Sequence, residues 1–122
     1  MSIAVALDDL PETLARYRFA YLLTVGDDGR AHIVSAYITV SGGSLIVADT
    51  GRRTRANIEA RPSITLLWPP ADAGDHSLIV DGLATLPDAE FVAVAPTWAV
   101  LHRPAPPQMF RAAARSWEDG SP

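Results

Sequence analysis

The sequence contains no cysteine. Disulfide bonds, thiol chemistry and cysteine-ligated zinc or iron–sulfur sites are therefore excluded. Lysine is missing as well, because all ten basic residues are arginine. The lack of cysteine fits a reducing compartment, and we expect the protein to be cytoplasmic.

Long apolar runs are also missing, and none approaches the roughly 20 residues that a membrane-spanning helix needs. The N-terminal stretch carries Asp8 and Asp9 where a secretory signal would have a basic start and a long apolar segment. The net charge of −4 argues against a broad nucleic-acid-binding surface. We therefore expect neither a membrane nor a nucleic acid as a partner.

The sequence shows no residue pattern typical of metal binding or of acyl transfer. His32, His76 and His102 lie too far apart for the i, i+4 spacing of a helical metal pair. No Gly-x-Ser-x-Gly segment occurs that could present a nucleophilic serine. We expect no metal site and assign no catalytic residue.

The 122 residues suit one domain, and folding at this length buries roughly two thirds of the unfolded chain's surface. A hydrophobic content of 48% with 20% charged residues is typical of an ordinary globular protein. We expect one domain over residues 1–105. Residues 106–122 are rich in proline and alanine and are expected to form a C-terminal tail or a short helix. Trp117 in that tail is a large apolar ring of the kind that docks on a partner surface.

The pattern of apolar runs and turn signals predicts a mainly β protein. A helix is expected at about residues 10–18, with Asp9 as its cap, Pro11 in its first turn and Glu12 completing a capping box. Six strands are expected at residues 20–25, 31–40, 44–49, 63–68, 76–86 and 91–101. The first two are joined by an Asp-Asp-Gly hairpin signal, and Ser41-Gly42-Gly43 marks another tight turn. Gly82 indicates a bulge or a close approach, and Pro96 indicates an edge or a bulge.

Residues 31–40 alternate between two faces. The even-numbered positions form an apolar face that suits a core. The odd-numbered positions suit a subunit interface or a ligand wall, and they are Ala31, Ile33, Ser35, Tyr37 and Thr39. Short connections exclude parallel crossovers, so the six strands predict a small antiparallel barrel with one brief helix between the third and fourth.

The most informative feature is the cluster of Arg52, Arg53 and Arg55. It lies between a predicted strand and a predicted helix at residues 53–60, which Arg61-Pro62 ends. Free backbone amides, the positive end of the helix dipole and arginine forks together suit a phosphate. A solvated basic loop is the alternative. Gly51, just before the cluster, is either an ordinary turn residue or a point where the backbone approaches the phosphate closely.

The order of helix, hairpin, third strand, basic turn, short helix and fourth strand resembles the split-barrel flavin-binding proteins related to pyridoxamine 5′-phosphate oxidase. The resemblance covers roughly residues 10–102. It is carried by the hairpin at residues 22–32, the basic turn at residues 52–58 with Arg61-Pro62, and the strand segment at residues 80–84. Their order and spacing together are more specific than any one of them.

This resemblance implies a six-stranded antiparallel split barrel that forms a homodimer, with a cofactor in each of two grooves between the subunits. The cofactor is FMN or, as in an actinobacterial branch, a deazaflavin coenzyme. The residues that would hold its phosphate are Thr50, Arg52, Arg53 and Thr54. Ser35 and its neighbours Val34 and Ala36 would lie near the ring, and Asn57 would orient the turn.

The function implied is an FMN-binding oxidoreductase that acts on a small-molecule substrate. The alternatives are a deazaflavin-dependent reductase on the same fold and a non-catalytic cofactor-binding or structural barrel. Thr54 stands where the family often has lysine, so Arg52 or Arg55 would have to take that role. The chain lacks the long C-terminal segment of a true pyridoxamine 5′-phosphate oxidase, and vitamin B6 oxidation is not expected.

Overall fold

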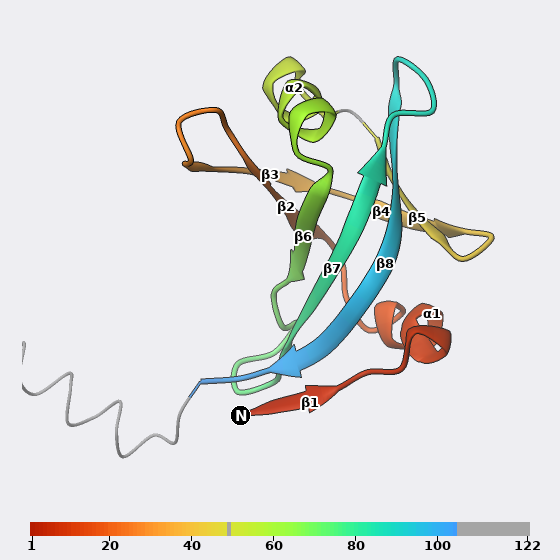
Figure 1. The fold of residues 1–122 in the computed structure, drawn as a ribbon. Coiled ribbons are helices and arrows are strands. Elements are labelled where there is room, and N and C mark those ends of the chain that lie inside the picture. The colour runs from red at the N-terminus through yellow and green to blue at the C-terminus, as the bar shows by residue number, and fades with distance from the viewer. Residues whose placement is uncertain (49, 105–122) are drawn as a thin grey trace, which may run out of the picture.

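The computed structural model describes residues 1–48 and 50–104. These residues form one curled antiparallel sheet of eight strands with two short α-helices and one 3₁₀ turn (Figure 1). In chain order the elements are β1 (Ser2–Ala4), η1 (Leu7–Asp9), α1 (Leu10–Leu14), β2 (Ala20–Val25), β3 (Ala31–Ala36), β4 (Ile38–Ser41), β5 (Ser44–Ala48), α2 (Arg52–Ala60), β6 (Ser63–Trp68), β7 (Ser77–Thr85) and β8 (Phe91–His102).

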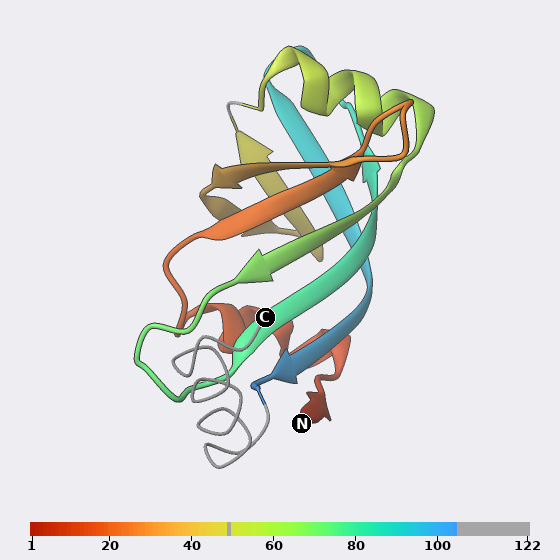
Figure 2. The same ribbon diagram turned by 90° about the vertical axis from the view of Figure 1, so that its left-hand side faces the viewer.

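The strand order explains the barrel shape. Neighbouring strands run β3-β2-β6-β7-β8-β5-β4, and β1 adds to β8. The two strands at the ends of this path, β3 and β4, are separated along the chain by Tyr37 alone. Because one residue cannot bridge a flat sheet of this width, the sheet must curl until its ends approach each other (Figure 2). The predicted antiparallel split barrel is confirmed.

The strand count differs from the six expected for two reasons. The run at residues 31–40 divides at Tyr37, because β3 pairs with β2 whereas β4 pairs with β5. The short β1 was not expected, since its three residues are all exposed and carry no alternating pattern. It is defined only by its pairing with Val100 to His102 of β8.

The N-terminal helix is shorter than expected. The α-helix covers only Leu10–Leu14 and follows directly on the 3₁₀ turn. Asp9 already has helical backbone angles (φ −89°, ψ −3°), and its side chain makes no capping hydrogen bond. The predicted cap is therefore wrong, because a capping residue needs extended angles to turn its side chain onto the helix amides.

The centre of the sheet contains the predicted bulge. The register between β7 and β8 shifts at Asp81/Gly82, where Gly82 faces Pro96 and Asp81 faces Trp98. A Cβ on Gly82 would lie 2.6 Å from Val94 Cγ1. Both the close approach at Gly82 and the irregularity at Pro96 are thus confirmed.

The core fills the curled sheet between α1 at one end and α2 at the other (Figures 1 and 2). Leu10 of α1 and Ile58 of α2 are buried against it. None of the described helices has the length and apolarity to cross a membrane. The tail expected over residues 106–122, with Trp117, lies outside the described residues, as does Asp49 at the expected end of the third strand.

Candidate functional site

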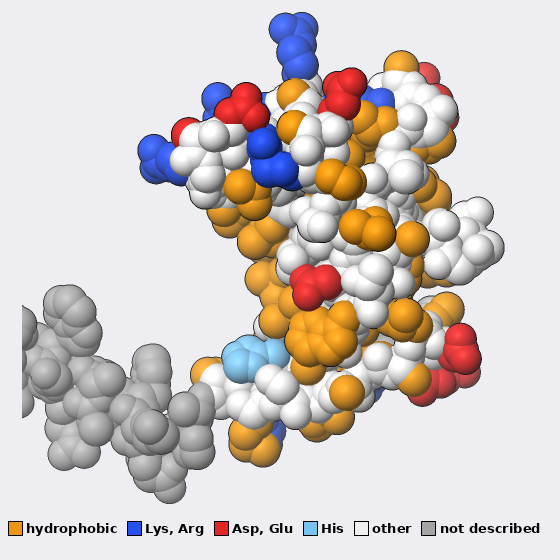
Figure 3. Space-filling model, viewed as in Figure 1, with side chains coloured by type: hydrophobic (Ala, Val, Ile, Leu, Met, Phe, Trp, Pro, Cys, Tyr) orange, Lys and Arg blue, Asp and Glu red, His pale blue; other side chains and the backbone are white. Residues whose placement is uncertain are grey.

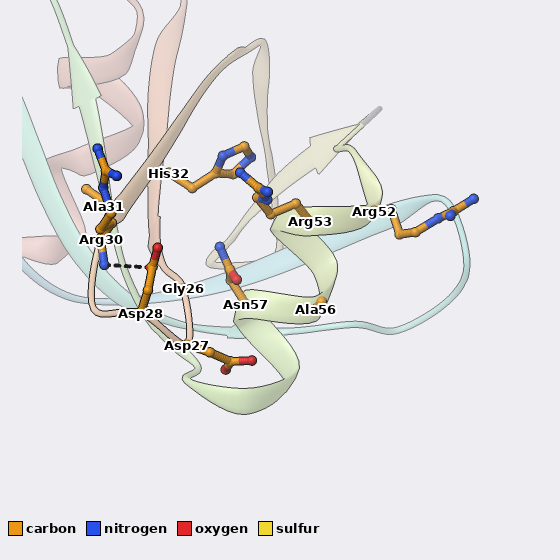
Figure 4. A pocket seen from close by; sticks show the side chains of 10 residues that line it. All are labelled: Gly26, Asp27, Asp28, Arg30, Ala31, His32, Arg52, Arg53, Ala56 and Asn57. Carbon is orange, nitrogen blue, oxygen red and sulfur yellow. Dashed lines mark hydrogen bonds between the residues drawn. The ribbon is translucent and has the colours of Figure 1, made fainter.

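An open groove lies between the β2–β3 hairpin and helix α2, at one end of the barrel. Its volume is about 930 Å³. Figure 3 shows that charged side chains gather over this end of the molecule, whereas the flank below it is largely apolar. The groove is lined by Gly26, Asp27, Asp28, Arg30, Ala31, His32, Arg52, Arg53, Ala56 and Asn57 (Figure 4).

The hairpin forms one wall. The Gly26 amide donates to the Arg30 carbonyl (2.9 Å), and the Gly29 amide donates to the Gly26 carbonyl (2.9 Å). Gly29 has φ +79°, a conformation that glycine adopts without strain. The Arg30 amide also donates to Asp28 Oδ1 (3.0 Å). The backbone of Arg30 is therefore held in place, while its side chain is exposed.

His32 lies on the face of β3 opposite to Ala31 and Ile33, because side chains alternate along a strand. That face continues with Val34 and Ala36, which pack against the core. The groove is thus the continuation of the inner face of β3 beyond the end of the core. Helix α2 covers this continuation from the other side (Figure 4).

The first turn of α2 forms the second wall. Its capping residue, Gly51, is extended (φ −71°, ψ 172°), and a Cβ there would meet no atom within 4 Å. The Arg55 amide is the first to donate within the helix, to the Gly51 carbonyl (3.2 Å). The amides of Arg52, Arg53 and Thr54 therefore have no acceptor within the helix, as is general for a first turn.

The side chains of Arg52 and Arg53 do not hold the described fold together. Both are exposed, and neither makes a hydrogen bond or an ion pair with any residue of the described ranges. Figure 4 shows Arg53 directed over the groove toward His32, whereas Arg52 extends away from it. Two guanidinium groups and three amides without a hydrogen-bond partner in the described ranges thus belong to the same helix end.

The rest of α2 is anchored to the hairpin. Asn57 is buried, and its Nδ2 donates to Thr24 Oγ1 (3.0 Å). Arg61 Nε donates to the Val25 carbonyl (2.8 Å), and Arg61 Nη2 forms an ion pair with Asp27 Oδ1 (2.7 Å). Asn57 therefore holds the helix against β2.

A further anchor reaches the loop before β8. Arg55 Nη1 donates to the Phe91 carbonyl (3.1 Å), and Nη2 donates to the Asp88 carbonyl. The Asp88 carboxylate accepts the amides of Phe91 and Glu90, both at 2.8 Å. These two hydrogen bonds, with a smaller contribution from the charge of Arg55, lower the pKa of Asp88. Arg55 is thus used inside the fold, and its expected role as a substitute for the missing lysine is not supported.

The predicted phosphate residues divide into two groups. Arg52 and Arg53 line the groove with Asn57, although only the Arg53 side chain is directed over it. Thr54 is completely buried, so only its backbone amide can face a ligand at the helix end. The buried hydroxyls of Thr50 and Thr54 have no hydrogen-bond partner within the described part of the chain.

The residues predicted to lie near the flavin ring are on β3 but do not line this groove. Ser35 is exposed on the face opposite to His32, in a separate recess of about 370 Å³ with Phe19, Tyr21 and Tyr37. Its neighbours Val34 and Ala36 point toward the core. The structure therefore does not bring the Ser35 side chain into the groove of Arg52 and Arg53. Along the described sheet, however, β3 is an end strand, so the backbone of residues 34–36 has one unpaired edge.

Among the groove residues that were not predicted as site residues, Arg30 and His32 carry the basic side chains. The available signal was their position directly after the Asp-Asp-Gly turn of the hairpin. That signal does not reveal that α2 lies opposite them. The approach depends on contacts such as Asn57 to Thr24, which are 33 residues apart in sequence.

Comparison with known proteins places this geometry in a wider group. No family model matches the chain. An F420 reductase has a similar structure, with a TM-score of 0.61 and 22% identity over 72% of this chain and 93% of that protein. A pyridoxamine 5′-phosphate oxidase-like protein from Listeria innocua gives a TM-score of 0.66 and 14% identity over 78% and 96%. An FAD-binding protein from Mesorhizobium loti gives 0.65 and 15% over 83% and 96%.

The fold is therefore that of the pyridoxamine 5′-phosphate oxidase-like split barrels. Within this fold, two mycobacterial proteins are similar in sequence: the uncharacterized proteins Mb0449c of Mycobacterium bovis and MT0457 of Mycobacterium tuberculosis. Each is 41% identical over 118 residues, which covers 84% of this chain and 83% of the relative. The chain belongs to the same family as these two proteins.

Proposed function

We propose that the protein binds a phosphate-bearing flavin or deazaflavin and acts as a small oxidoreductase. The observation that carries the proposal is the pair of guanidinium groups of Arg52 and Arg53, which have no partner among the described residues, at the open N-terminal end of α2. In a protein of net charge −4, such a local concentration of positive charge suits a small anionic ligand. The similar structures include an F420 reductase and an FAD-binding protein, which supports a cofactor of the flavin type.

The donors at this helix end fit a phosphate. A phosphate monoester carries about 1.5 to 2 negative charges at neutral pH and offers three acceptor oxygens. Arg52 and Arg53 supply charged donors, and the amides of the first turn supply neutral ones. The open space above Gly51 leaves room for the phosphate to approach the backbone. FMN is the smallest cofactor that meets these requirements.

The free edge of β3 suits the ring system. Backbone amides and carbonyls of residues 34–36 that no strand pairs can hydrogen-bond to the polar rim of a flavin. Val34, Ser35 and Ala36 would then hold the ring through their backbone, whichever way their side chains point. When bound, the ring supplies the hydride or electron transfer, so the protein needs no dedicated acid–base pair.

A homodimer completes the proposal. Large apolar side chains are exposed on the described surface, and Ile33 (55%), Trp98 (50%) and Leu83 (49%) are the clearest cases outside the termini and loops. An interface between subunits would cover these side chains. A native mass of two chains at micromolar concentration would support this part of the proposal, and a mass of one chain would contradict it.

A non-catalytic barrel is the competing function. It is favoured by Thr54, which replaces the family's frequent lysine and buries its side chain completely. Under this hypothesis the helix end is an ordinary solvated basic turn. The exposed arginines would then contribute neither to ligand affinity nor to stability.

Visible absorbance of freshly purified protein, followed by thermal unfolding with added FMN or deazaflavin coenzyme, tests the proposal. A ligand at 100 times its dissociation constant adds about 2.7 kcal/mol of stability, which corresponds to a rise in Tm of roughly 10 °C for a domain of this size. Arg53→Gln should remove most of the rise, whereas Arg18→Gln, on the exposed chain before β2, should leave it unchanged. An unchanged Tm with both cofactors would favour the non-catalytic barrel.

A further inference from the structure

A row of side chains on the outer face of the sheet contains one carboxylate among uncharged groups. Residues paired across neighbouring strands project on the same side of a sheet. The outer row, defined by this pairing, consists of Trp98, Asp81, Thr65, Leu23 and Ile33. It faces away from the core, because the residues that alternate with it, Val80 and Leu66 among them, are fully buried. Its two ends, Trp98 and Ile33, are exposed.

Asp81 has no cationic partner in the described ranges. Its Oδ1 accepts a hydrogen bond from Thr65 Oγ1 (2.7 Å), and no arginine of residues 1–48 or 50–104 forms an ion pair with it. The Asp81 side chain is partly buried beside apolar neighbours. A carboxylate in such surroundings suits an arginine, whose guanidinium group can donate two parallel hydrogen bonds to it.

A hollow beside Asp81 can take a large side chain. It has a volume of about 430 Å³ and lies at the bulge where the register between β7 and β8 shifts. Leu83 and Val25 belong to its lining, and both are exposed. An aromatic ring that filled the hollow would cover them. This part of the face thus suits an occupant that combines a large apolar side chain with an arginine.

The sequence that follows β8 contains both. Wound as a helix, residues 108–117 place their apolar side chains on one side, because these recur at i, i+4 and i+8. The residues on that side are Met109, Phe110, Ala113, Ala114 and Trp117. Arg111 and Arg115 are one turn apart on the flank next to Ala114. This segment is therefore complementary to the outer row in both apolarity and charge.

The segment is long enough to reach the row. From Trp98, β8 runs to the end of the barrel opposite α2, and the described residues end at Pro104 (Figure 1). The distance along the chain from Trp98 to Pro104 is about 20 Å. Residues 105–107 can extend by up to about 10 Å, and a helix over residues 108–117 is about 15 Å long. A segment that turns back along the outer face therefore brings Trp117 to the level of Trp98.

A second copy of the chain fits this part of the face less well. Another molecule that met it with the same face would bring the same outer row, which contains no arginine to pair with Asp81. The proposed subunit interface is therefore better suited to the uncharged Ile33 end of the row. A segment docked at the Trp98 end would adjoin the partner subunit without excluding it.

We infer that residues 108–117 dock on the outer face of their own chain, with Trp117 in the hollow at the bulge and Arg111 or Arg115 paired with Asp81. This inference needs no cofactor and goes beyond the proposed function. It assigns Trp117, the large apolar ring of the C-terminal segment, a contact surface within the same molecule.

The lack of cysteine permits a site-specific crosslinking experiment on the full chain. The variant Ser116→Cys carries a single thiol next to Trp117, to which a photoreactive benzophenone is attached. After irradiation, peptide masses should place most crosslinks on β7 and β8, within one chain. Denaturing electrophoresis separates products that join two chains from those within one.

Further substitutions in the labelled chain test the two contacts. Trp117→Ala should lower the crosslinked yield on β7 and β8 about fivefold or more, because the aromatic ring that fills the hollow is lost. Asp81→Asn and Arg111→Gln/Arg115→Gln should each lower it about twofold. Combining these two changes should lower it no further, because they remove the same ion pair. The control Arg18→Gln should leave the yield unchanged.

Thermal unfolding checks that each variant is folded. Asn at position 81 keeps an oxygen that can accept the Thr65 hydroxyl, so the sheet should remain intact. The substitutions at Arg111, Arg115 and Trp117 lie outside the sheet and test the same contacts independently of it.

Three results would overturn the inference, and each leaves the proposed function standing. Crosslinks mainly to β1, α1 or α2 would place the segment elsewhere on the molecule. Crosslinks that mainly join two chains would assign the hollow to a second copy. A yield that neither Trp117→Ala nor the charge variants change would show that these side chains do not make the contact.

Discussion

The four arginines in and just after α2 fall into two pairs with opposite roles. Arg55 and Arg61 donate to backbone carbonyls 36 residues away in sequence, at Phe91 and Val25. Arg52 and Arg53 are exposed in the first turn, and their side chains make no hydrogen bond or ion pair with any described residue. Arg55 and Arg61 hold the helix in place, whereas Arg52 and Arg53 remain exposed at its N-terminal end.

Because of this difference, we expect cofactor affinity and the stability of the fold to depend on different arginines. An arginine that already donates to the fold gains little by turning to a ligand, because it would give up its hydrogen bonds to backbone carbonyls. An arginine without partners loses no internal hydrogen bond when it binds an anion. We therefore expect substitutions at the free pair to change binding only, and substitutions at the anchoring residues to change stability.

The largest expected effect is on binding. The double variant Arg52→Gln/Arg53→Gln removes two charge-assisted donors, so cofactor affinity should fall by about 100-fold or more. The free energy of unfolding without cofactor should change by less than about 0.5 kcal/mol, because neither side chain supports the fold. Fluorescence titration and urea unfolding measure the two quantities. Unaltered affinity in this variant would mean that the cofactor does not bind at α2.

The next effect concerns the buried anchor. Asn57→Ala leaves the Thr24 hydroxyl without its donor beneath the helix, and we expect a loss of about 2 kcal/mol in the free energy of unfolding. A double-mutant cycle with Thr24→Val measures the coupling between the two side chains. Independent, additive losses would show that the bond at 3.0 Å does not hold the helix.

The exposed anchors should contribute less. Arg61 and Asp27 are exposed at 37% and 95% of their side chains, so Arg61→Gln should cost only about 0.5–1 kcal/mol of stability. Arg55→Gln should cost about 1 kcal/mol through its contacts with the loop before β8. Cofactor affinity, measured at full folding, should stay within about twofold for both variants. A loss of cofactor affinity as large as that expected for the Arg52→Gln/Arg53→Gln variant would contradict the proposed division of roles.

A smaller effect is expected at the buried threonine. Thr54→Val replaces a fully buried hydroxyl that has no described partner by a methyl group, so stability should change by less than about 0.5 kcal/mol or rise. Cofactor affinity should be unchanged if Thr54 faces the phosphate only through its amide. A clear loss of affinity would show that the hydroxyl turns toward the ligand on binding.

The smallest effect is an acid sensitivity of the Arg55 anchor. Because the folded state lowers the pKa of Asp88, the stability that this carboxylate adds is fully present above its unfolded pKa. It is lost as the pH falls through the lower folded value, in the range below about pH 4. Asp88→Asn should flatten the fall in stability over this range, as acid unfolding followed by circular dichroism would show. If the acid unfolding curves of Asp88→Asn and the natural protein were identical, the acid sensitivity would come from other carboxylates.

Local pattern predicted most of the strands. The expected ranges 20–25 and 63–68 coincide with β2 and β6, because alternation and turn residues act over a few neighbours. The same reasoning identified the irregularity at Gly82 and the start of a helix at the arginine cluster. It failed at the end of α1 and at β1, where one turn of helix and three exposed residues carry too little pattern.

The candidate site was only partly predictable. Arg52 and Arg53 could be chosen from their place between a strand and a helix, but Arg30 and His32 could not. They become site residues only because α2 packs across the hairpin.

The sequence by itself determined where strands, turns and the basic helix start occur, since each depends on interactions within a few residues. The tertiary structure decided which arginines remain free, because Arg55 and Arg61 find their acceptors across 36 residues of chain. It also decided that the inner face of β3 ends in a groove, since only the packing of α2 on the hairpin creates the second wall.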